Sequence, residues 1–227
     1  MRTCAFCGKK ATTKDHIPPR SMYPHTKRNG ILSVPSCEKC NSGSSDDDEY
    51  FKENLIVIGR KYKIEDIELV EKIVFDQLLK KKFKFEELNS KIHVEMTFPS
   101  SLIYTPPIEP VYYFRPDVKR LSFITHKYIK GLYVHTFRKK HVPYNCHVNS
   151  NMITPGIYCD GNSKKIINCF MDNIRIISDV FAYSCIIPVD RPTATFWLLC
   201  FYRSIFFLGS LTEIETINLK ESNDELL

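Results

Sequence analysis

Glycine is scarce in this 227-residue chain, and no long apolar run is present. The 8 glycines, against 13 prolines, exclude collagen-like and glycine-rich low-complexity proteins. The most apolar stretch, residues 196–209, is interrupted by Arg203 and is shorter than the ~20 residues that a membrane span needs. We therefore expect this stretch to be buried sheet. Residues 1–10 contain no apolar segment like that of a secretory signal peptide, so we expect a cytoplasmic protein with no membrane partner.

The chain has enough apolar residues for a packed core and carries a modest positive charge. Hydrophobic residues make up 43% of it, which excludes a disordered protein. The net charge is +6 and the pI is near 8.7, which is compatible with a polyanionic partner. The nine cysteines are an odd number in a chain with no visible secretory signal. Metal binding is therefore a better expectation for clustered cysteines than a disulfide framework.

The spacing of apolar residues predicts an α+β protein in two parts. Residues 1–58 would form a zinc-bound module that is too small to rely on an apolar core alone. Residues 59–227 would form a domain of helices and an antiparallel sheet, whose role is substrate binding or docking of a protein partner. The predicted elements are a helix over 62–88, a strand over 91–98, an extended connector over 99–116, a helix over 117–139, three or four antiparallel strands from 164 onward and a frayed tail over 213–227.

Two C-x-x-C pairs are the strongest local signal. They are Cys4-x-x-Cys7 and Cys37-x-x-Cys40, and each pair can present two thiolates to one ion from a tight turn. Four thiolates around a tetrahedral ion are the typical arrangement of a structural zinc site. The alternatives are a redox C-x-x-C, which normally occurs singly, and four unrelated cysteines. The other five are isolated and read as ordinary core or surface residues: Cys146, Cys159, Cys169, Cys185 and Cys200.

A second motif lies between and beside these pairs. Asp15-His16-Ile17-Pro18-Pro19 occupies the long loop between them, and Asn41 directly follows the last cysteine. Together with the acidic D-D-E-Y-F at 47–51, the combination resembles the HNH endonucleases with a ββα-metal core. It is most similar to the subset with two zinc-binding cysteine pairs, including the junction-resolving phage endonucleases that carry D-H and C-N at these places. The resemblance covers residues 1–55 and implies a treble-clef-like zinc module that cleaves DNA.

The residue types agree with that chemistry. Phosphodiester hydrolysis needs an activated water and a cation that stabilises charge on the phosphoryl oxygens. His16 is the side chain of the motif suited to accepting a proton near neutral pH. Asp15 and Asn41 offer oxygen ligands for Mg²⁺ or Mn²⁺. Because neighbours on a strand point to opposite faces, Asp15 and His16 can share one site only if the backbone is bent or bulged there, and Pro18-Pro19 would favour a bend.

The sequence departs from the family pattern at one position. Many HNH proteins have a central Asn where this chain has Leu32, and the nearest candidate is Asn29. If the helix continues from Asn41 in steps of four residues, Glu49 lies on the same face and could ligate the metal or orient His16. The alternative is that Asp46, Asp47, Asp48 and Glu49 are solvated charges at a helix start. The alternative for Asn41 is a helix cap with no role in metal binding.

Basic residues supply candidate contacts to a phosphate backbone. One group is in the loop that the cysteine pairs bound: Lys9, Lys10, Lys14, Arg20, Lys27 and Arg28. A second, over residues 115–140, reads either as a phosphate-tracking helix or as a solvated helix face. Neither group encodes base readout, so we expect little sequence specificity.

The sequence therefore predicts a metal-dependent endonuclease that hydrolyses DNA, and the resemblance implies a role in phage defence or restriction. One alternative is a non-catalytic zinc-binding module that binds nucleic acid or protein. Another is an effector that cleaves RNA with the same site.

Overall fold

A five-stranded antiparallel sheet forms the centre of the computed structural model, which describes residues 2–23, 28, 30–61, 92–95, 111–114, 116–153 and 161–214. In spatial order the strands are β5 (Cys146–Ile153), β9 (Ile205–Glu213), β8 (Ala194–Phe201), β7 (Phe181–Ile186) and β6 (Arg175–Ile176). The apolar stretch 196–209 forms most of the β8–β9 hairpin, as its composition predicted. Tyr202 and Arg203 turn this hairpin with φ angles of 48° and 59°.

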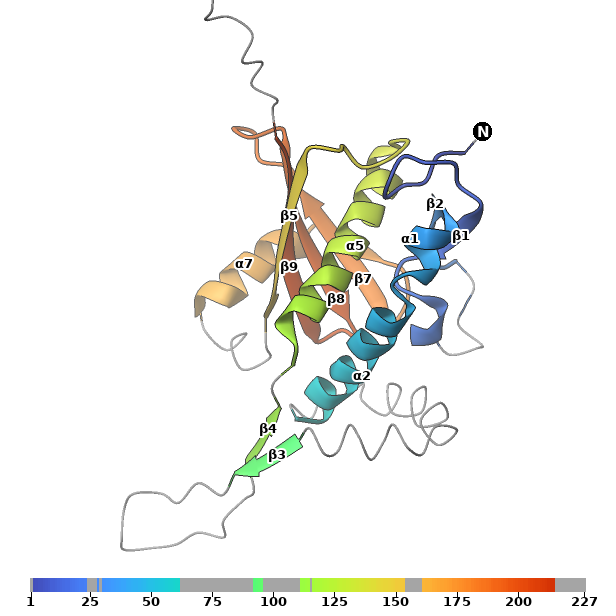
Figure 1. Cartoon of the computed structure of the whole chain (residues 1–227). Coiled ribbons are helices and arrows are strands. Elements are labelled where there is room, and N and C mark those ends of the chain that lie inside the picture. Colours follow the sequence, from blue (N-terminus) through green and yellow to red (C-terminus); the bar gives the residue numbers. More distant parts are fainter. Residues whose placement is uncertain are drawn as a thin grey trace, which may run out of the picture.

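The two faces of the sheet are covered by different helices (Figure 1). Trp197, Leu199 and Phe201 of β8 belong to the large core beneath α5 (Val118–Phe137). The residues between them, Leu198 and Cys200, instead pack with Ile167 and Phe170 of α7 (Gly161–Met171). Since successive side chains of a strand point to opposite faces, α5 and α7 lie on opposite sides of the sheet.

Helix α5 matches the helix predicted over 117–139. Its start is fixed by Asp117, whose carboxylate accepts hydrogen bonds from the backbone N–H groups of Lys119 and Arg120. Its end is marked by Arg138 in the left-handed conformation. The predicted apolar face is buried at four of its five positions, and Thr136 is half-buried. The buried four are Leu121, Ile124, Tyr128 and Leu132.

The N-terminal part has the order strand, strand, helix. Strand β1 (Thr13–His16) pairs antiparallel with β2 (Ser33–Ser36), and a 3-10 turn, η1 (Arg20–Met22), lies between them. Helix α1 (Glu38–Ser42) follows, then α2 (Ser45–Lys61). This part packs directly on the sheet domain: the Phe51 ring of α2 lies 5.5 Å from that of Tyr128 on α5 and 5.3 Å from that of Phe201 on β8. Both parts therefore share one apolar cluster.

Several element predictions can be compared with the structure. The strand expected over 91–98 is present as β3 (Ile92–Glu95), but the expected connector contains a strand, β4 (Val111–Phe114), that pairs with β3. Residues 164–171, where a sheet was expected, belong to helix α7, because Ile167 and Phe170 recur at helical spacing against the sheet. Strand β5 was not predicted. The helix over 62–88 lies outside the described residues, as does most of the tail predicted over 213–227. Its first residue, Glu213, is instead the end of β9 and pairs with Cys146. Among the described helices, none has the length and apolar character to cross a membrane.

Close packing of α5 against the N-terminal loop is testable at Gly131. A methyl group at this position would lie 1.9 Å from Ile17 Cδ1. Overpacking typically costs about 1–3 kcal/mol, whereas replacing Gly by Ala within a helix recovers at most about 1 kcal/mol. We therefore expect Gly131→Ala to lower the free energy of unfolding, measured by urea denaturation.

Ile17→Val supplies the matched background, because it removes the Cδ1 atom that the new methyl group would meet. In that background Gly131→Ala should cost less than in the wild-type chain. Equal costs in both backgrounds would contradict the contact.

Candidate functional site

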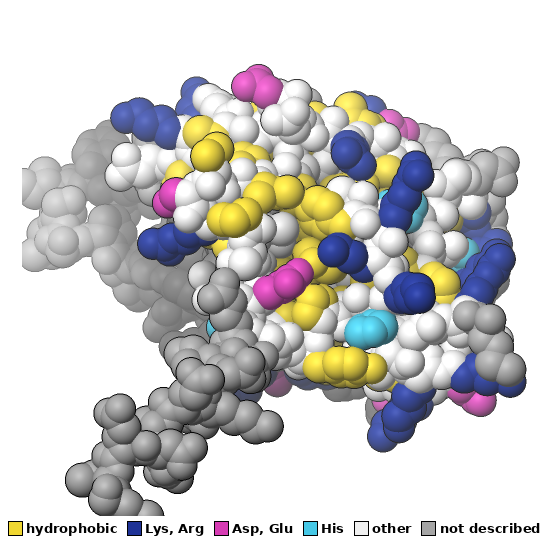
Figure 2. Space-filling model, turned by 90° about the horizontal axis from the view of Figure 1, so that it is seen from above, with side chains coloured by type: hydrophobic (Ala, Val, Ile, Leu, Met, Phe, Trp, Pro, Cys, Tyr) yellow, Lys and Arg dark blue, Asp and Glu magenta, His cyan; other side chains and the backbone are white. Residues whose placement is uncertain are grey.

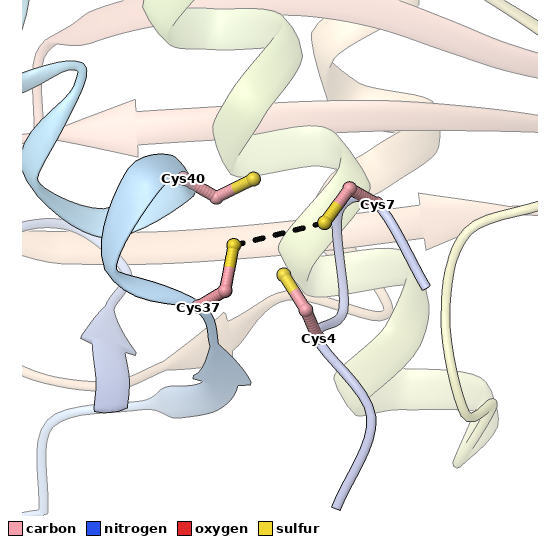
Figure 3. Close-up of side chains that lie close together, drawn as sticks. All are labelled: Cys4, Cys7, Cys37 and Cys40. Carbon is pink, nitrogen blue, oxygen red and sulfur yellow. Dashed lines mark hydrogen bonds between the residues drawn. The ribbon is translucent and has the colours of Figure 1, made fainter. Parts of the chain in front are cut away.

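The four N-terminal cysteines form a group that could hold a metal ion such as zinc (Figure 3). All four Sγ atoms lie within 4.8 Å of one another, and those of Cys7 and Cys37 are 3.7 Å apart. A tetrahedral ion with Zn–S bonds of about 2.3 Å would place its sulfur ligands about 3.8 Å apart. Within the described part of the chain, this is the one cluster of three or more Cys, His, Asp or Glu ligand atoms close enough for an ion.

Backbone hydrogen bonds hold the two halves of this cluster together. Cys4 and Cys7 lie on a turn closed by the hydrogen bond from Gly8 N to Cys4 O (3.0 Å), and Gly8 has the positive φ of 69° that favours glycine. Ala5 N donates to Pro35 O at 2.8 Å, which ties this turn to β2. Cys37 is the N-cap residue of α1 and Cys40 lies within that helix, so both follow β2 directly.

The electrostatics of the sulfurs suit a cationic ligand. Burial raises the pKa of the Cys4 thiol, but backbone N–H groups of Cys37, Phe6 and Cys7 outweigh it and lower the pKa to about 6. Burial and the neighbouring sulfurs raise the pKa of Cys40. The fold alone thus favours the thiolate of Cys4. The other thiols would be deprotonated more readily beside a cation, because it offsets the repulsion between neighbouring thiolates.

Strand β1 is regular through the Asp-His motif. Asp15 pairs with Val34 and His16 with Ser33, so the strand contains no bulge, and the chain turns only after His16. The bend expected at residues 15–16 is therefore absent, and the side chains of Asp15 and His16 leave β1 on opposite faces. Asp15 is 4% exposed and faces the interior, whereas His16 at the strand's end is half-buried. Regular alternation keeps Asp15 on the same face as Thr13.

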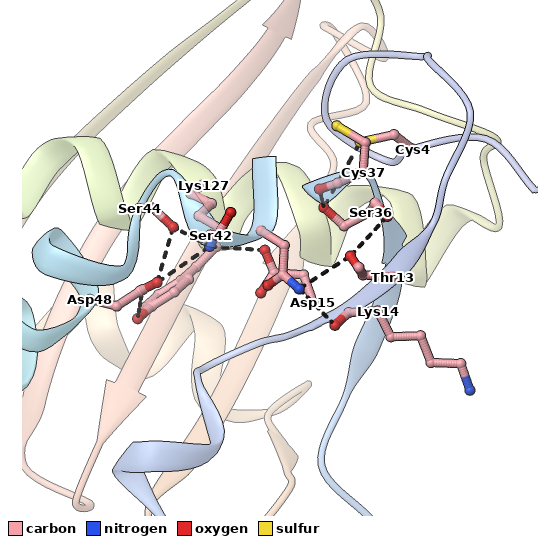
Figure 4. A network of polar contacts seen from close by, with 12 residues as sticks. Cys4, Thr13, Lys14, Asp15, Ser36, Cys37, Ser42, Ser44, Asp48 and Lys127 are labelled. Carbon is pink, nitrogen blue, oxygen red and sulfur yellow. Dashed lines mark hydrogen bonds and ion pairs between the residues drawn. The ribbon is translucent and has the colours of Figure 1, made fainter. Parts of the chain in front are cut away.

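Asp15 meets a cation from the C-terminal domain (Figure 4). Its Oδ2 atom lies 2.9 Å from Nζ of Lys127 on α5, and both side chains are buried. The contact is an ion pair, because its angles are outside hydrogen-bond geometry. The same Nζ donates to Ser44 Oγ at 2.6 Å and lies 3.4 Å from Asp48 Oδ2. Burial raises the pKa of Asp15, and the charge of Lys127 opposes that rise.

Asn41 reaches the same strand from α1. Its Nδ2 donates to Thr13 Oγ1 at 3.2 Å and to the Lys14 carbonyl at 3.4 Å. Both contacts use the amide nitrogen, so the orientation of the amide is fixed and its Oδ1 accepts no hydrogen bond from the described residues. On Asp15, Lys127 meets Oδ2, and the backbone N–H of His16 also stabilises the carboxylate. The Asn41 amide oxygen and the Asp15 carboxylate fit the hard ligands that Mg²⁺ or Mn²⁺ prefers.

His16 lies in a positive environment. Burial lowers the pKa of its ring, and the charges of Arg20 and Lys14 lower it further, so the neutral imidazole is favoured. The Leu32 backbone raises the pKa of the ring in part. Nδ1 itself makes no hydrogen bond of good geometry. A neutral ring is the form that can accept a proton.

The remaining candidate ligands are placed differently. Asn29 lies outside the described residues. Gly43 and Ser44 break the helix between α1 and α2, so Glu49 does not continue the face of Asn41 as expected. Asp48 is buried rather than solvated, with its Oδ1 accepting from Tyr128 Oη at 3.0 Å.

Sequence reasoning missed the polar group around Lys127, yet a signal was present. Lys127 lies three residues after Ile124 and four before Gly131, on the apolar face of α5. Asp48 lies three residues before Phe51, on the buried face of α2. A charge on an apolar helix face indicates a buried partner.

The basic residues divide by exposure. Four in the cysteine-bounded loop are exposed: Lys9, Lys10, Lys14 and Arg20. Arg28 donates to the Tyr23 carbonyl at 3.3 Å, and Lys27 lies outside the described residues. On α5, Lys127 is buried and Arg120 pairs with Asp47 at 2.5 Å, so this helix is not the continuous basic face expected over 115–140. Figure 2 shows Lys and Arg around an apolar strip on one face of the molecule, with acidic side chains dispersed between them.

Comparison with protein-family models, with curated proteins and with solved structures yields no match to this chain.

Proposed function

We propose that this protein is a zinc-stabilised, HNH-like endonuclease that hydrolyses DNA phosphodiester bonds with Mg²⁺ or Mn²⁺. One observation carries the proposal. The four cysteines bring the turn at residues 4–8 to the junction of β2 and α1, and from α1 the Asn41 amide hydrogen-bonds to the strand that bears Asp15 and His16. This strand–strand–helix order is the one that the HNH resemblance implies.

His16 is the proposed general base. His16 leaves β1 on the face opposite Asp15, so the proposal puts both in one site only at the end of the strand, where the chain turns after His16. There the neutral ring would accept the proton of the attacking water. The exposed side chains of Lys14 and Arg20 lie close enough to lower its pKa, and they would hold the phosphate beside it. Contacts of this kind position a backbone without reading bases, which supports low sequence specificity.

Asp15 Oδ1 and Asn41 Oδ1 are the proposed ligands of the catalytic cation. Such a cation offsets negative charge on the phosphoryl oxygens and on the departing oxygen. The sulfur cluster has no catalytic task in this proposal. It would fix the start of α1, and thereby the position of Asn41 beside β1.

The zinc assignment predicts that Cys37→Ser loses both metal and stability. Zinc binding to such a site is folding free energy, and each kcal/mol shifts the melting temperature of a chain of this size by about 2–4 °C. We expect the wild-type chain to carry zinc by elemental analysis, and the variant to lose it and to melt at least about 10 °C lower.

Cys169→Ser is the matched control, because Cys169 is an exposed cysteine on α7. It should retain the zinc content and melting temperature of the wild type. A Cys37→Ser chain with unchanged metal content and melting temperature would refute the structural zinc.

The catalytic assignment predicts that His16→Ala abolishes nicking of supercoiled plasmid. With Mg²⁺ or Mn²⁺ present, we expect a rate loss on the order of 10²- to 10⁴-fold, since a general base contributes that much. Zinc content and melting temperature should stay unchanged, because His16 is not part of the sulfur cluster. His147→Ala, on an exposed position of β5, is the control and should cleave like the wild type.

Parallel incubations separate the alternatives. Cleavage of RNA but not of plasmid would identify the RNA-cleaving effector. A shift of DNA in a gel without cleavage by the zinc-loaded chain would identify a non-catalytic binding module and refute the nuclease.

A further inference from the structure

Lys127 is a buried cation on the apolar face of α5. It is 7% exposed, and its ammonium lies within 3.4 Å of three oxygens: Ser44 Oγ and Asp48 Oδ2 at the start of α2, and Asp15 Oδ2 on β1. Ser44 and Asp48 accept hydrogen bonds from this ammonium, and Asp15 Oδ2 faces it as an ion-pair partner. The Phe6 ring lies 5.9 Å from Nζ on another side.

The partners of Lys127 are themselves held in place. Asp48 Oδ2 accepts from Ser44 Oγ at 3.0 Å, and Asp48 Oδ1 accepts from the buried Tyr128 hydroxyl at 3.0 Å. Both oxygens of Asp48 are thus engaged, and Asp48 and Ser44 together fix the ammonium. Asp15 differs, because Lys127 engages only its Oδ2.

The ammonium therefore approaches Asp15 from the interior, through the face of α5. Because the ammonium meets Oδ2, Oδ1 is the oxygen of Asp15 that Lys127 does not engage. Asn41 lies against the same strand from α1, with its amide oxygen unengaged by the described residues. In Figure 4, Asp15 lies between Lys127 on one side and Thr13 and Lys14 on the other.

We propose that Lys127 is a positioning residue of the nuclease site: it holds Asp15 Oδ2 from within, so that Oδ1 is presented to the catalytic cation. The inference rests on the proposed nuclease function. It makes α5, from the C-terminal domain, part of the support of a site whose ligands lie in residues 1–55. Side chains that orient a metal ligand typically contribute about 10- to 100-fold to metal affinity.

The test measures Mn²⁺ binding to the zinc-loaded full-length chain by electron paramagnetic resonance, together with plasmid cleavage as a function of Mn²⁺ concentration. Removing the ammonium alone leaves two buried carboxylates uncompensated, which can prevent folding. The principal variant is therefore Lys127→Met with Asp48→Asn, in which the lost positive charge is matched by a lost negative one. Lys127→Met alone is measured as well if its melting curve is cooperative.

We expect the double variant to bind Mn²⁺ on the order of 10- to 100-fold more weakly than the wild type. Its cleavage should recover in part at high Mn²⁺, because His16 is intact. Lys130→Met, one turn along α5 and not in contact with Asp15, is the matched control and should bind Mn²⁺ like the wild type.

Two results would overturn the inference alone. If the double variant melts lower but binds Mn²⁺ as tightly as the wild type, Lys127 is merely structural. If it binds Mn²⁺ more tightly, Lys127 competes with the cation for Asp15 instead of presenting it. By contrast, a wild-type chain that neither binds Mn²⁺ nor cleaves would overturn the proposed function itself. The His16→Ala variant separates the two cases further, because it should lose cleavage and keep its affinity for Mn²⁺.

Discussion

The convergence of four sulfurs is the constraint on which the N-terminal part depends. The two cysteine pairs lie at opposite ends of a long loop, and this loop contains only two short strands and one 3-10 turn among its described residues. Fixing such a loop costs conformational entropy. A metal ion that holds all four sulfurs would offset that cost at the point where β2 ends and α1 begins. Because Asn41 immediately follows Cys40, the same junction sets the position of the amide beside β1.

The second support comes from the sheet domain, and it reaches the Asp-His strand through one helix. Gly131 allows α5 to approach Ile17 more closely than any larger residue would. One turn earlier on the same helix, Lys127 meets Asp15. An apolar contact and an ion pair from α5 thus bracket the segment that contains His16. The N-terminal part is therefore built on the larger domain, and its core residue Phe51 packs against α5 and β8 as part of the same cluster.

Local signals predicted what depends on local chemistry. The cysteine spacing predicted the sulfur cluster, helical periodicity predicted α5, and the apolar stretch 196–209 predicted the β8–β9 hairpin. The interior position of Asp15 was not predictable in this way, because its partner Lys127 lies on α5, more than a hundred residues away in the chain. Helix α7 was missed for the same reason, since its apolar residues become a recognisable face only against the outer side of the sheet.

The buried ion pair is best understood through orientation rather than stability. Taking Lys127 and two carboxylates out of water is costly, and well-packed apolar side chains often give equal or greater stability in such places. An apolar core at these positions would, however, leave the direction of the Asp15 carboxylate undefined. With Asp48 saturated by Ser44 and Tyr128, the ammonium has one carboxylate left to orient, and that carboxylate directly precedes His16. The ion pair thus fixes the direction of the Asp15 carboxylate from the sheet domain, and this orientation offsets the cost of burying the charges.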